Sequence, residues 1–341
     1  MIALLWACSG EPEAPPAPAP IAPSEALGRV LHGPVHPSDM DAIHAFIAER
    51  RAREHGPWGQ DISLARSTDG LVWHTLEGGP VVQTGAVPEL VRGDDGRLYL
   101  FHVDGDLDKL ADWAQNEPRR FYGRGMPGLG ALALSVSEDG GESFFPVHEF
   151  EVIGLVLGMV VDPEVIRLPD GTWRLYYVGM PIQEHSPEAW APGTRHKVWY
   201  AESRDLIRWE QRGLAVDGPY ADPAVACFDE RCVMLSFGLD QSVSTDGGRT
   251  FTYEGSIDAP GFAPDIQQLG DGRWRAWWNT QERGAALQTA TSPDLRTWTT
   301  GSASLDIYGE APSVLREGDS WLMAFHHFKP DVTPPDGATK E

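Results

Sequence analysis

DPEVIRLPDGTWRLYY, residues 162–177, contains the pattern that decides the fold. An extended run with a proline beside an acid leads into a turn rich in Asp and Gly, and an aromatic-rich strand follows. Four more copies of this pattern are VPELVRGDDGRLYLF (87–101), DPAVACFDERCVMLSF (222–237), APDIQQLGDGRWRAWW (263–278) and EAPSVLREGDSWLMAF (310–325). Each copy predicts two antiparallel strands joined by a tight turn.

A second signal alternates with the first and consists of Ser-x-Asp, a turn and an aromatic residue. Its copies are STDGLVW (67–73), SEDGGESF (137–144), SRDLIRW (203–209), STDGGRTF (244–251) and SPDLRTW (292–298). Ser and Asp side chains can bond nearby backbone N–H groups and fix a hairpin, so we expect a structural role for these turns. Together the two signals supply four antiparallel strands, which is the composition of a propeller blade.

The order of the signals predicts how the ring closes. Four complete blades begin near Pro88, Pro163, Pro223 and Pro264, whereas the blade that begins near Pro312 lacks its Ser-x-Asp unit. The unpaired unit lies at residues 61–74. We therefore predict an all-β, five-bladed β-propeller over residues 61–328, closed by its N-terminal strands so that the ring has no open edge.

The segments outside the repeat indicate export. Residues 1–8, MIALLWAC, are interpreted as the remnant of a lipoprotein signal with lipidation at Cys8, and the alternative is a disordered apolar start. A Pro/Ala-rich tether over 9–37 follows, then a short helix and linker over 38–60; residues 329–341 are predicted to be a disordered tail. We expect a monomer in the cell envelope or outside the cell, held to a membrane only through the lipid.

Charge and cysteine content narrow the class of ligand. The formal net charge of -23 argues against nucleic acid and anionic membranes as partners, and is compatible with a neutral carbohydrate. Cys227 and Cys232 would face each other across a hairpin, either as a disulfide or as two buried thiols. No cofactor is required by any motif.

Acids gather around all five prolines of the first signal. The first strand of each blade lines the central channel of a propeller, so we expect these acids to meet at one mouth. They are Glu89, Asp162, Glu164, Asp222, Asp265 and Glu310. Acids at such positions either bond backbone N–H groups, hold an axial cation such as calcium, or act on a substrate. Insertions at 105–128 and 181–196 carry Trp113 and Trp190, which we expect to stack on sugars at the rim.

Three consecutive blades carry a more specific pattern: Ala221-Asp222-Pro223, Ala263-Pro264-Asp265 and Glu310-Ala311-Pro312. This pattern resembles the family 43 glycoside hydrolases, which are five-bladed propellers, whereas the Ser-x-Asp turns resemble the Asp boxes of sialidases. The first resemblance implies that Asp222 is the general base, Asp265 a modulator that orients the sugar, and Glu310 the general acid of an inverting reaction on neutral sugars. Glu89, Asp162 and Glu164 would then help to bind the substrate.

Two points set requirements for this interpretation. The three blades come last in this chain, so the order of blades is circularly permuted relative to the family. The three acids also stand at different positions relative to proline, and strand side chains alternate faces. They can converge only if the first strands bend where they begin.

Other readings of the same residues stay open. Asp162 could replace Asp222 as the base, and His326 or His327 could bind an axial metal or simply pack. A non-catalytic glycan-binding or scaffold propeller is the main alternative function. A sialidase-like hydrolase, which binds a carboxylate with three arginines, is a third reading, based on Arg92, Arg167 and Arg316.

Overall fold

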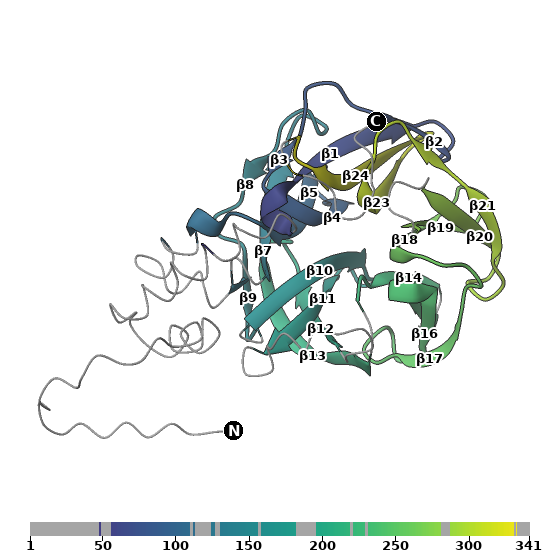
Figure 1. Ribbon diagram of the computed structural model, residues 1–341. Helices are drawn as coiled ribbons and strands as arrows, with labels where there is room; N and C mark the ends of the chain where they lie inside the picture. The colour runs from purple at the N-terminus through teal and green to yellow at the C-terminus, as the bar shows by residue number, and fades with distance from the viewer. Residues whose placement is uncertain are drawn as a thin grey trace, which may run out of the picture.

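The computed structural model describes residues 56–109, 124–126, 130–155, 158–181, 196–218, 221–228, 231–280 and 287–330, and the single residues 48, 112 and 332. Five antiparallel sheets stand around a central axis, with the first strand of each nearest the centre (Figure 1). This arrangement confirms the predicted five-bladed propeller. Cys8, the tether, Trp113 and Trp190 lie outside the described residues, and so does the helix predicted within 38–60 apart from residue 48.

Four blades follow one another along the chain. The first has β4 (Gly85–Arg92), β5 (Leu98–Asp104), β7 (Gly130–Ser137) and β8 (Phe145–Pro146), with β6 (Gly125–Met126) beside β7. The second has β10 (Gly158–Arg167), β11 (Trp173–Pro181), β12 (His196–Ser203) and β13 (Arg208–Gly218), with β9 (Glu151–Ile153) parallel to β13. The third has β14 (Ala224–Phe228), β15 (Arg231–Leu235), β16 (Asp240–Ser244) and β17 (Thr252–Ser256), with the 3-10 turn η4 (Phe237–Leu239) between β15 and β16. The fourth has β18 (Phe262–Gln268), β19 (Trp274–Asn279), β20 (Gln288–Ser292) and β21 (Thr299–Ser302).

The fifth blade joins the two ends of the described chain. It has β23 (Glu310–Glu317), β24 (Ser320–Phe328), β1 (Gln60–Ser67) and β2 (Val72–Thr75), with β3 (Val82–Gln83) on β1, β22 (Ser304–Leu305) on β2 and η1 (Pro57–Gly59) before β1. β1 pairs with β24 along its whole length, from Gln60 opposite Phe328 to Ser67 opposite Trp321. The predicted closure by N-terminal strands is therefore present.

Lys329 strengthens this closure from just beyond the last strand. Its ammonium donates hydrogen bonds to the Trp58 carbonyl, 3.0 Å away, and to the Thr84 hydroxyl, 2.7 Å away. Lys329 thus ties the end of β24 to both η1 and the first blade.

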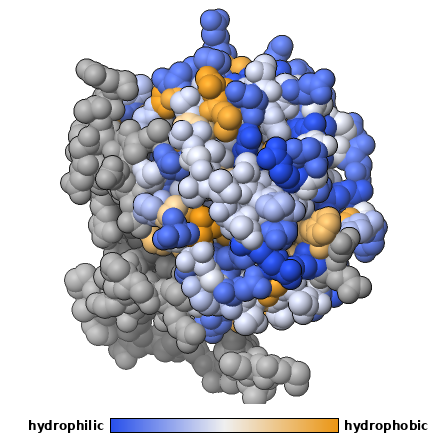
Figure 2. Space-filling view, turned by 90° about the vertical axis from the view of Figure 1, so that its right-hand side faces the viewer, coloured by the Kyte–Doolittle hydropathy of each residue, from blue (hydrophilic) through white to orange (hydrophobic). Residues whose placement is uncertain are grey.

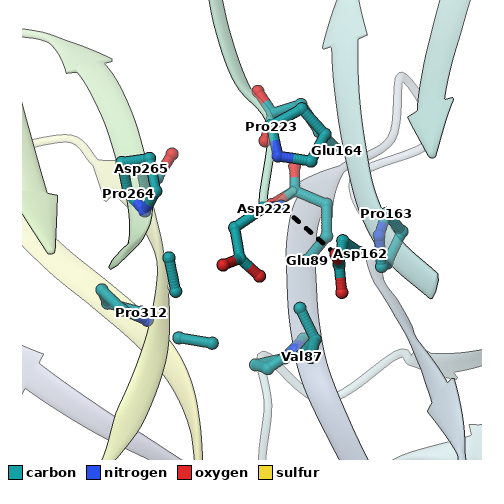
Figure 3. A pocket seen from close by; sticks show the side chains of 13 residues that line it. Val87, Glu89, Asp162, Pro163, Glu164, Asp222, Pro223, Pro264, Asp265 and Pro312 are labelled. Carbon is teal, nitrogen blue, oxygen red and sulfur yellow. Dashed lines mark hydrogen bonds between the residues drawn. The ribbon is translucent and has the colours of Figure 1, made fainter. Parts of the chain in front are cut away.

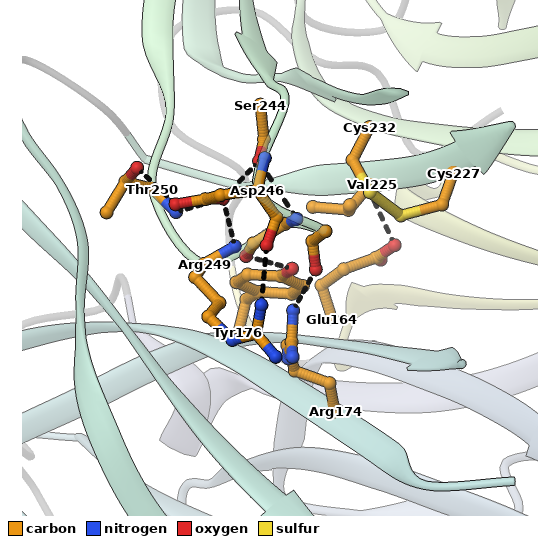
Figure 4. Close-up of a disulfide and its surroundings, with 12 residues drawn as sticks. Glu164, Arg174, Tyr176, Val225, Cys227, Cys232, Ser244, Asp246, Arg249 and Thr250 are labelled. Atoms are coloured by element: carbon orange, nitrogen blue, oxygen red, sulfur yellow. Dashed lines mark hydrogen bonds between the residues drawn. A yellow bond between two sulfur atoms is a disulfide. The ribbon is translucent and has the colours of Figure 1, made fainter. Parts of the chain in front are cut away.

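The Ser-x-Asp turns form a repeated hydrogen-bond motif at the end of each blade's third strand. In all five copies the Ser hydroxyl donates to the Asp carboxylate over 2.6–3.3 Å. In the third blade the Asp246 carboxylate also accepts the N–H groups of Arg249 and Thr250, at 2.9 and 3.0 Å (Figure 4). The turns lie at the opposite end of the blades from the acids that precede and follow the prolines, so their role is structural.

The hydrophobic core lies between neighbouring blades, and the aromatic residue of each second signal contributes to it. Trp209 of the second blade packs edge-on against Phe101 of the first, with ring centroids 5.8 Å apart, and Trp73 meets Trp277 of the fourth blade at 6.4 Å. A disulfide joins Cys227 in β14 to Cys232 in β15 (Figure 4).

The face of the molecule shown in Figure 2 is mainly hydrophilic, with small separate apolar areas. Within the described part of the chain, no helix is long and apolar enough to cross a bilayer.

Candidate active site at one mouth of the channel

A bend occurs at the same point in all five first strands. The residue immediately before each proline has a positive φ: 46° at Val87, 54° at Asp162, 49° at Asp222, 48° at Ala263 and 51° at Ala311. Residues with side chains seldom adopt this conformation, and a following proline normally favours an extended one. A fivefold exception, placed around the channel, points to a constraint shared by all blades.

The bend acts as a β-bulge. In four blades the pairing with the second strand shifts across the proline, and in the third blade β14 begins only after Pro223. Because a bulge interrupts the alternation of faces, residues before and after the proline both line the channel, as Asp162 and Glu164 do (Figure 3). The strands therefore bend as the convergence of the acids requires.

The residues after the prolines form a girdle that links four of the five pairs of neighbouring blades. Glu89 accepts the N–H of Val165 at 3.2 Å, and Glu164 accepts that of Val225 at 2.8 Å. Asp265 likewise accepts the N–H of Val314 at 2.5 Å. Ser313 completes the girdle, since it accepts the N–H of Leu90 and donates to Glu89. The third blade has Ala224 at this position, so its link is missing.

The girdle carboxyls are buried in a narrow part of the channel. Burial, and then the charge of Asp265, raise the pKa of Glu89 well above its usual range; burial and the charges of Glu89 and Asp265 do the same for Glu164. Burial raises the pKa of Asp265 to about 7. The cavity that these carboxyls line together with Asp162 and Asp222 measures about 20 Å³, room for about one water molecule. A sugar ring does not fit inside this cavity, so any substrate must bind outside it, at the mouth.

The residues before the prolines form a second layer. Asp162 accepts the N–H of Asp222 at 3.2 Å (Figure 3), and Asp222 accepts the N–H of Ala263 in the next blade. Ala263 and Ala311 cannot continue this chain of contacts. Asn279 instead accepts the N–H of Ala311, at 2.8 Å.

Glu310 lies at this mouth, two residues before Pro312 and opposite His326 in β24. The Tyr308 hydroxyl donates to its Oε1, and His326 Nε2 is 3.4 Å from its Oε2. His326 Nδ1 accepts the N–H of Val87 at 3.1 Å, so in the neutral ring the proton is on Nε2 and faces Glu310. Each oxygen of Glu310 thus faces a donor.

Two further contacts hold the Glu310 segment in place. Asn279, at the end of β19, donates to the carbonyl of Gly309 at 2.9 Å and accepts the N–H of Ala311, so it fixes both neighbours of Glu310. Tyr308 stacks on Phe328, with ring centroids 6.2 Å apart and planes 9° apart. The sequence analysis missed Asn279 and Tyr308, whose only signal is their place at the end of an aromatic strand and beside an acid.

Asp222 and Glu310 differ from the other mouth acids in exposure. Both are mostly buried but slightly more exposed than the rest: the side chain of Glu310 is 12% exposed, whereas Glu89, Asp162, Glu164 and Asp265 are at most 9% exposed. Burial raises the pKa of Asp162 to about 6. Burial raises the pKa of Asp222 well above its usual range, and the charges of Asp162 and Glu310 add to this while His326 opposes it. Asp222 and Glu310 therefore interact electrostatically and are the least buried of the six acids, whereas Asp265 interacts with the deeper girdle.

The three arginines of the sialidase reading do not reach this site. Arg92 and Arg167 donate to the carbonyls of Gly96 and Gly171, in the hairpin turns at the far end of their strands, and Arg316 lies over the ring of Trp321. These three arginines do not form a cluster at the mouth and therefore give no support to the sialidase reading. Among the described residues, no group of three or more His, Cys, Asp or Glu side chains is arranged to hold a metal ion.

Comparison with known proteins adds evidence on the fold. No known family profile matches the sequence, and no curated protein does so either. A solved structure that matches is a family 43 beta-xylosidase/alpha-arabinofuranosidase from a compost microbial metagenome, in complex with xylotriose and calcium-free. Its TM-score is 0.50 at 12% identity, over 70% of this chain and 84% of that one. The chain has the family 43 fold.

Two other matching structures are more distant by TM-score. A family 117 glycoside hydrolase from Zobellia galactanivorans has a TM-score of 0.47 at 12% identity, over 74% of this chain and 87% of that one. A protein of unknown function from Dyadobacter fermentans has a TM-score of 0.45 at 17% identity, over 69% of this chain and 72% of that one. At such identities, the likeness to family 43 concerns the fold.

Proposed function

We propose that the protein is a glycoside hydrolase acting on neutral sugars, with Asp222 and Glu310 as its two catalytic carboxylates. The observation that carries the proposal is their shared position: they interact electrostatically at one mouth of the channel and are the least buried of its six acids. Glycoside hydrolysis needs such a pair, one protonated to assist the leaving group and one ionised.

The resemblance to family 43 assigns roles within the pair. Asp222 would activate a water molecule and Glu310 would protonate the leaving oxygen, with inversion at the anomeric carbon. An inverting reaction needs carboxyl groups about 6.5–9.5 Å apart, to leave room for the water. Asp265 would act as a positioning residue, because its bond to the N–H of Val314 fixes the strand that carries Glu310.

The hydrogen bonds of the site favour a second assignment with the roles exchanged. Donors from Tyr308 and His326 face both oxygens of Glu310, which suits an ionised carboxylate. The raised pKa of Asp222 suits a proton carrier. The same pair carries the reaction under both assignments, and leaving-group dependence distinguishes them.

The negative charge of the protein limits the class of substrate. The net charge of -23 and the cluster of acids at the mouth disfavour anionic sugars. The xylotriose in the family 43 neighbour makes xylosides and arabinosides the first compounds to test, with galactosides and fructosides completing the panel.

The test compares wild type with Asp222→Asn and Glu310→Gln on aryl glycosides with good leaving groups and on unactivated oligosaccharides. Loss of the general acid should slow the unactivated substrate far more than the activated one, whereas loss of the base should slow both. Asp258→Asn and Glu142→Gln, which change exposed acids elsewhere, are the matched controls. No turnover by wild type across the panel would refute the hydrolase.

A glycan-binding propeller without activity is the alternative. This alternative predicts no turnover by wild type or by either variant. It also predicts that both variants bind a glycan with the wild-type affinity. Isothermal titration with the same oligosaccharides measures that affinity.

A further inference from the structure

Two phenylalanines, Phe237 exposed and Phe262 partly buried, form a pair near Asp222. Phe237, in η4, is 46% exposed, and Phe262 begins β18 in the next blade. Their ring centroids are 6.5 Å apart and their planes differ by 34°. The two rings thus lie next to each other across the boundary between the third and fourth blades.

Backbone hydrogen bonds fix this pair relative to the candidate active site. The N–H of Phe237 donates to the carbonyl of Ala221, the residue before Asp222, at 2.9 Å. The N–H of Gly238 donates to the carbonyl of Gly261, the residue before Phe262, also at 2.9 Å. Gly238 has a φ of 78°, which favours glycine and turns the chain sharply after Phe237. The turn that presents Phe237 is therefore tied to the segments that carry Asp222 and Phe262.

Packing supports the pair from behind. The Trp278 indole donates to the carbonyl of Pro260 at 3.3 Å and lies against Gly261, where an added Cβ would overlap the indole ring. Trp278 itself is buried in the core between the third and fourth blades. The segment leading to Phe262 is thus held against a rigid surface.

Phe237 is left 46% exposed in a turn that backbone hydrogen bonds tie to both neighbouring segments. A pre-ordered aromatic surface loses little conformational entropy when a ligand covers it. Aromatic side chains next to a few polar groups are also the usual lining of ligand sites.

We propose that Phe237 and Phe262 form a sugar-binding platform, which receives the ring next to the sugar held at Asp222 and Glu310. The ligand class is a neutral oligosaccharide whose ring presents a face of C–H groups to the aromatic rings. This inference rests on the proposed function for the identity of the neighbouring sugar. It assigns Phe237 and Phe262 to affinity for longer substrates and gives them no part in proton transfer.

The test uses Phe237→Ala and Phe262→Ala, with Tyr253→Ala as the control, since Tyr253 is 56% exposed on the outer strand β17 of the third blade. Phe237→Trp keeps an aromatic surface and should restore binding. Titration calorimetry in the Glu310→Gln background measures affinity for xylotriose, arabinotriose and galactotriose. The platform predicts about tenfold weaker binding of the trisaccharide that is bound best, a difference of about 1.4 kcal/mol, and no change in Tyr253→Ala.

Kinetics separate this inference from the proposed function. The alanine variants should raise KM for the trisaccharide about tenfold at similar kcat, and should affect an aryl monosaccharide much less. Hydrolysis with unchanged trisaccharide affinity in both variants overturns the platform and leaves the hydrolase standing. Lost affinity without any hydrolysis by wild type supports the platform and refutes the hydrolase. If wild type binds none of the three trisaccharides, the platform is overturned.

Discussion

Asp265→Asn tests the girdle that links the blades. Burial raises the pKa of Asp265 to about 7, against about 3.9 in an unfolded chain. Between these values the folded protein binds more protons than the unfolded one, so wild-type stability falls as pH rises through this window. At about 1.36 kcal/mol per pH unit, the free energy of unfolding falls by about 2–3 kcal/mol between pH 5 and pH 8. The asparagine side chain of the variant cannot ionise, so the variant avoids this loss.

The substitution also has a contribution that does not depend on pH. Asp265 accepts two N–H groups, those of Ile266 and Val314, whereas an amide has one acceptor oxygen. One buried donor is left unpaired, at a cost of about 1–3 kcal/mol. The test is therefore how the difference in unfolding free energy between variant and wild type varies with pH. The sign of that difference at a single pH does not decide the question.

Urea unfolding at pH 5, 6, 7 and 8 measures this change. Between pH 5 and pH 8, the free energy of unfolding of Asp265→Asn should rise by about 2–3 kcal/mol relative to that of wild type. The control Asp258→Asn removes an exposed carboxylate beyond β17, and its free energy of unfolding should vary with pH as that of wild type does. Removing the charge of Asp265 also relieves Glu89 and Glu164, which adds to the gain. Parallel curves for Asp265→Asn and wild type would refute the reasoning.

Three other perturbations test separate parts of the structure. Asn279→Ala removes both hydrogen bonds that fix the neighbours of Glu310. We expect kcat/KM to fall about tenfold or more and the pH profile of kcat/KM to shift. An unchanged pH profile would mean that Asn279 has a purely structural role. Asp246→Ala should lower the free energy of unfolding by about 1–2 kcal/mol at neutral pH. Because hydrogen bonds lower the pKa of the Asp246 carboxyl, this destabilisation should become smaller as pH falls below about 4. Urea unfolding of variant and wild type at pH 3 and pH 7 measures the difference. In cells that express the full native start, labelled palmitate should be incorporated by wild type and not by Cys8→Ser; equal labelling of both would contradict the lipid anchor.

The fold was predictable because its signals are local and repeated. A hairpin such as 162–177 contains its own turn and both of its strands, and the unpaired unit at 61–74 matches the blade that lacks one. The meeting of the acids at one mouth followed from the repeat as well, since equivalent positions of a ring face a common axis.

The division of the acids into two layers was not predictable from the repeat. It depends on a left-handed residue before each proline and on hydrogen bonds between blades, such as that from the N–H of Val314 to Asp265. Partners of this kind are far apart in sequence and share no motif. The same holds for Asn279, whose contacts with Gly309 and Ala311 exist only once the fourth and fifth blades pack together.

The central claim is that Asp222 and Glu310 form a catalytic pair, and its most direct test is hydrolysis of a matched series of aryl glycosides by wild type, Asp222→Asn and Glu310→Gln. With the better leaving groups, one variant should approach wild-type rate while the other stays slow at every leaving group. The variant that recovers identifies the general acid. If both variants hydrolyse the whole series at the wild-type rate, the pair is not catalytic and the claim fails.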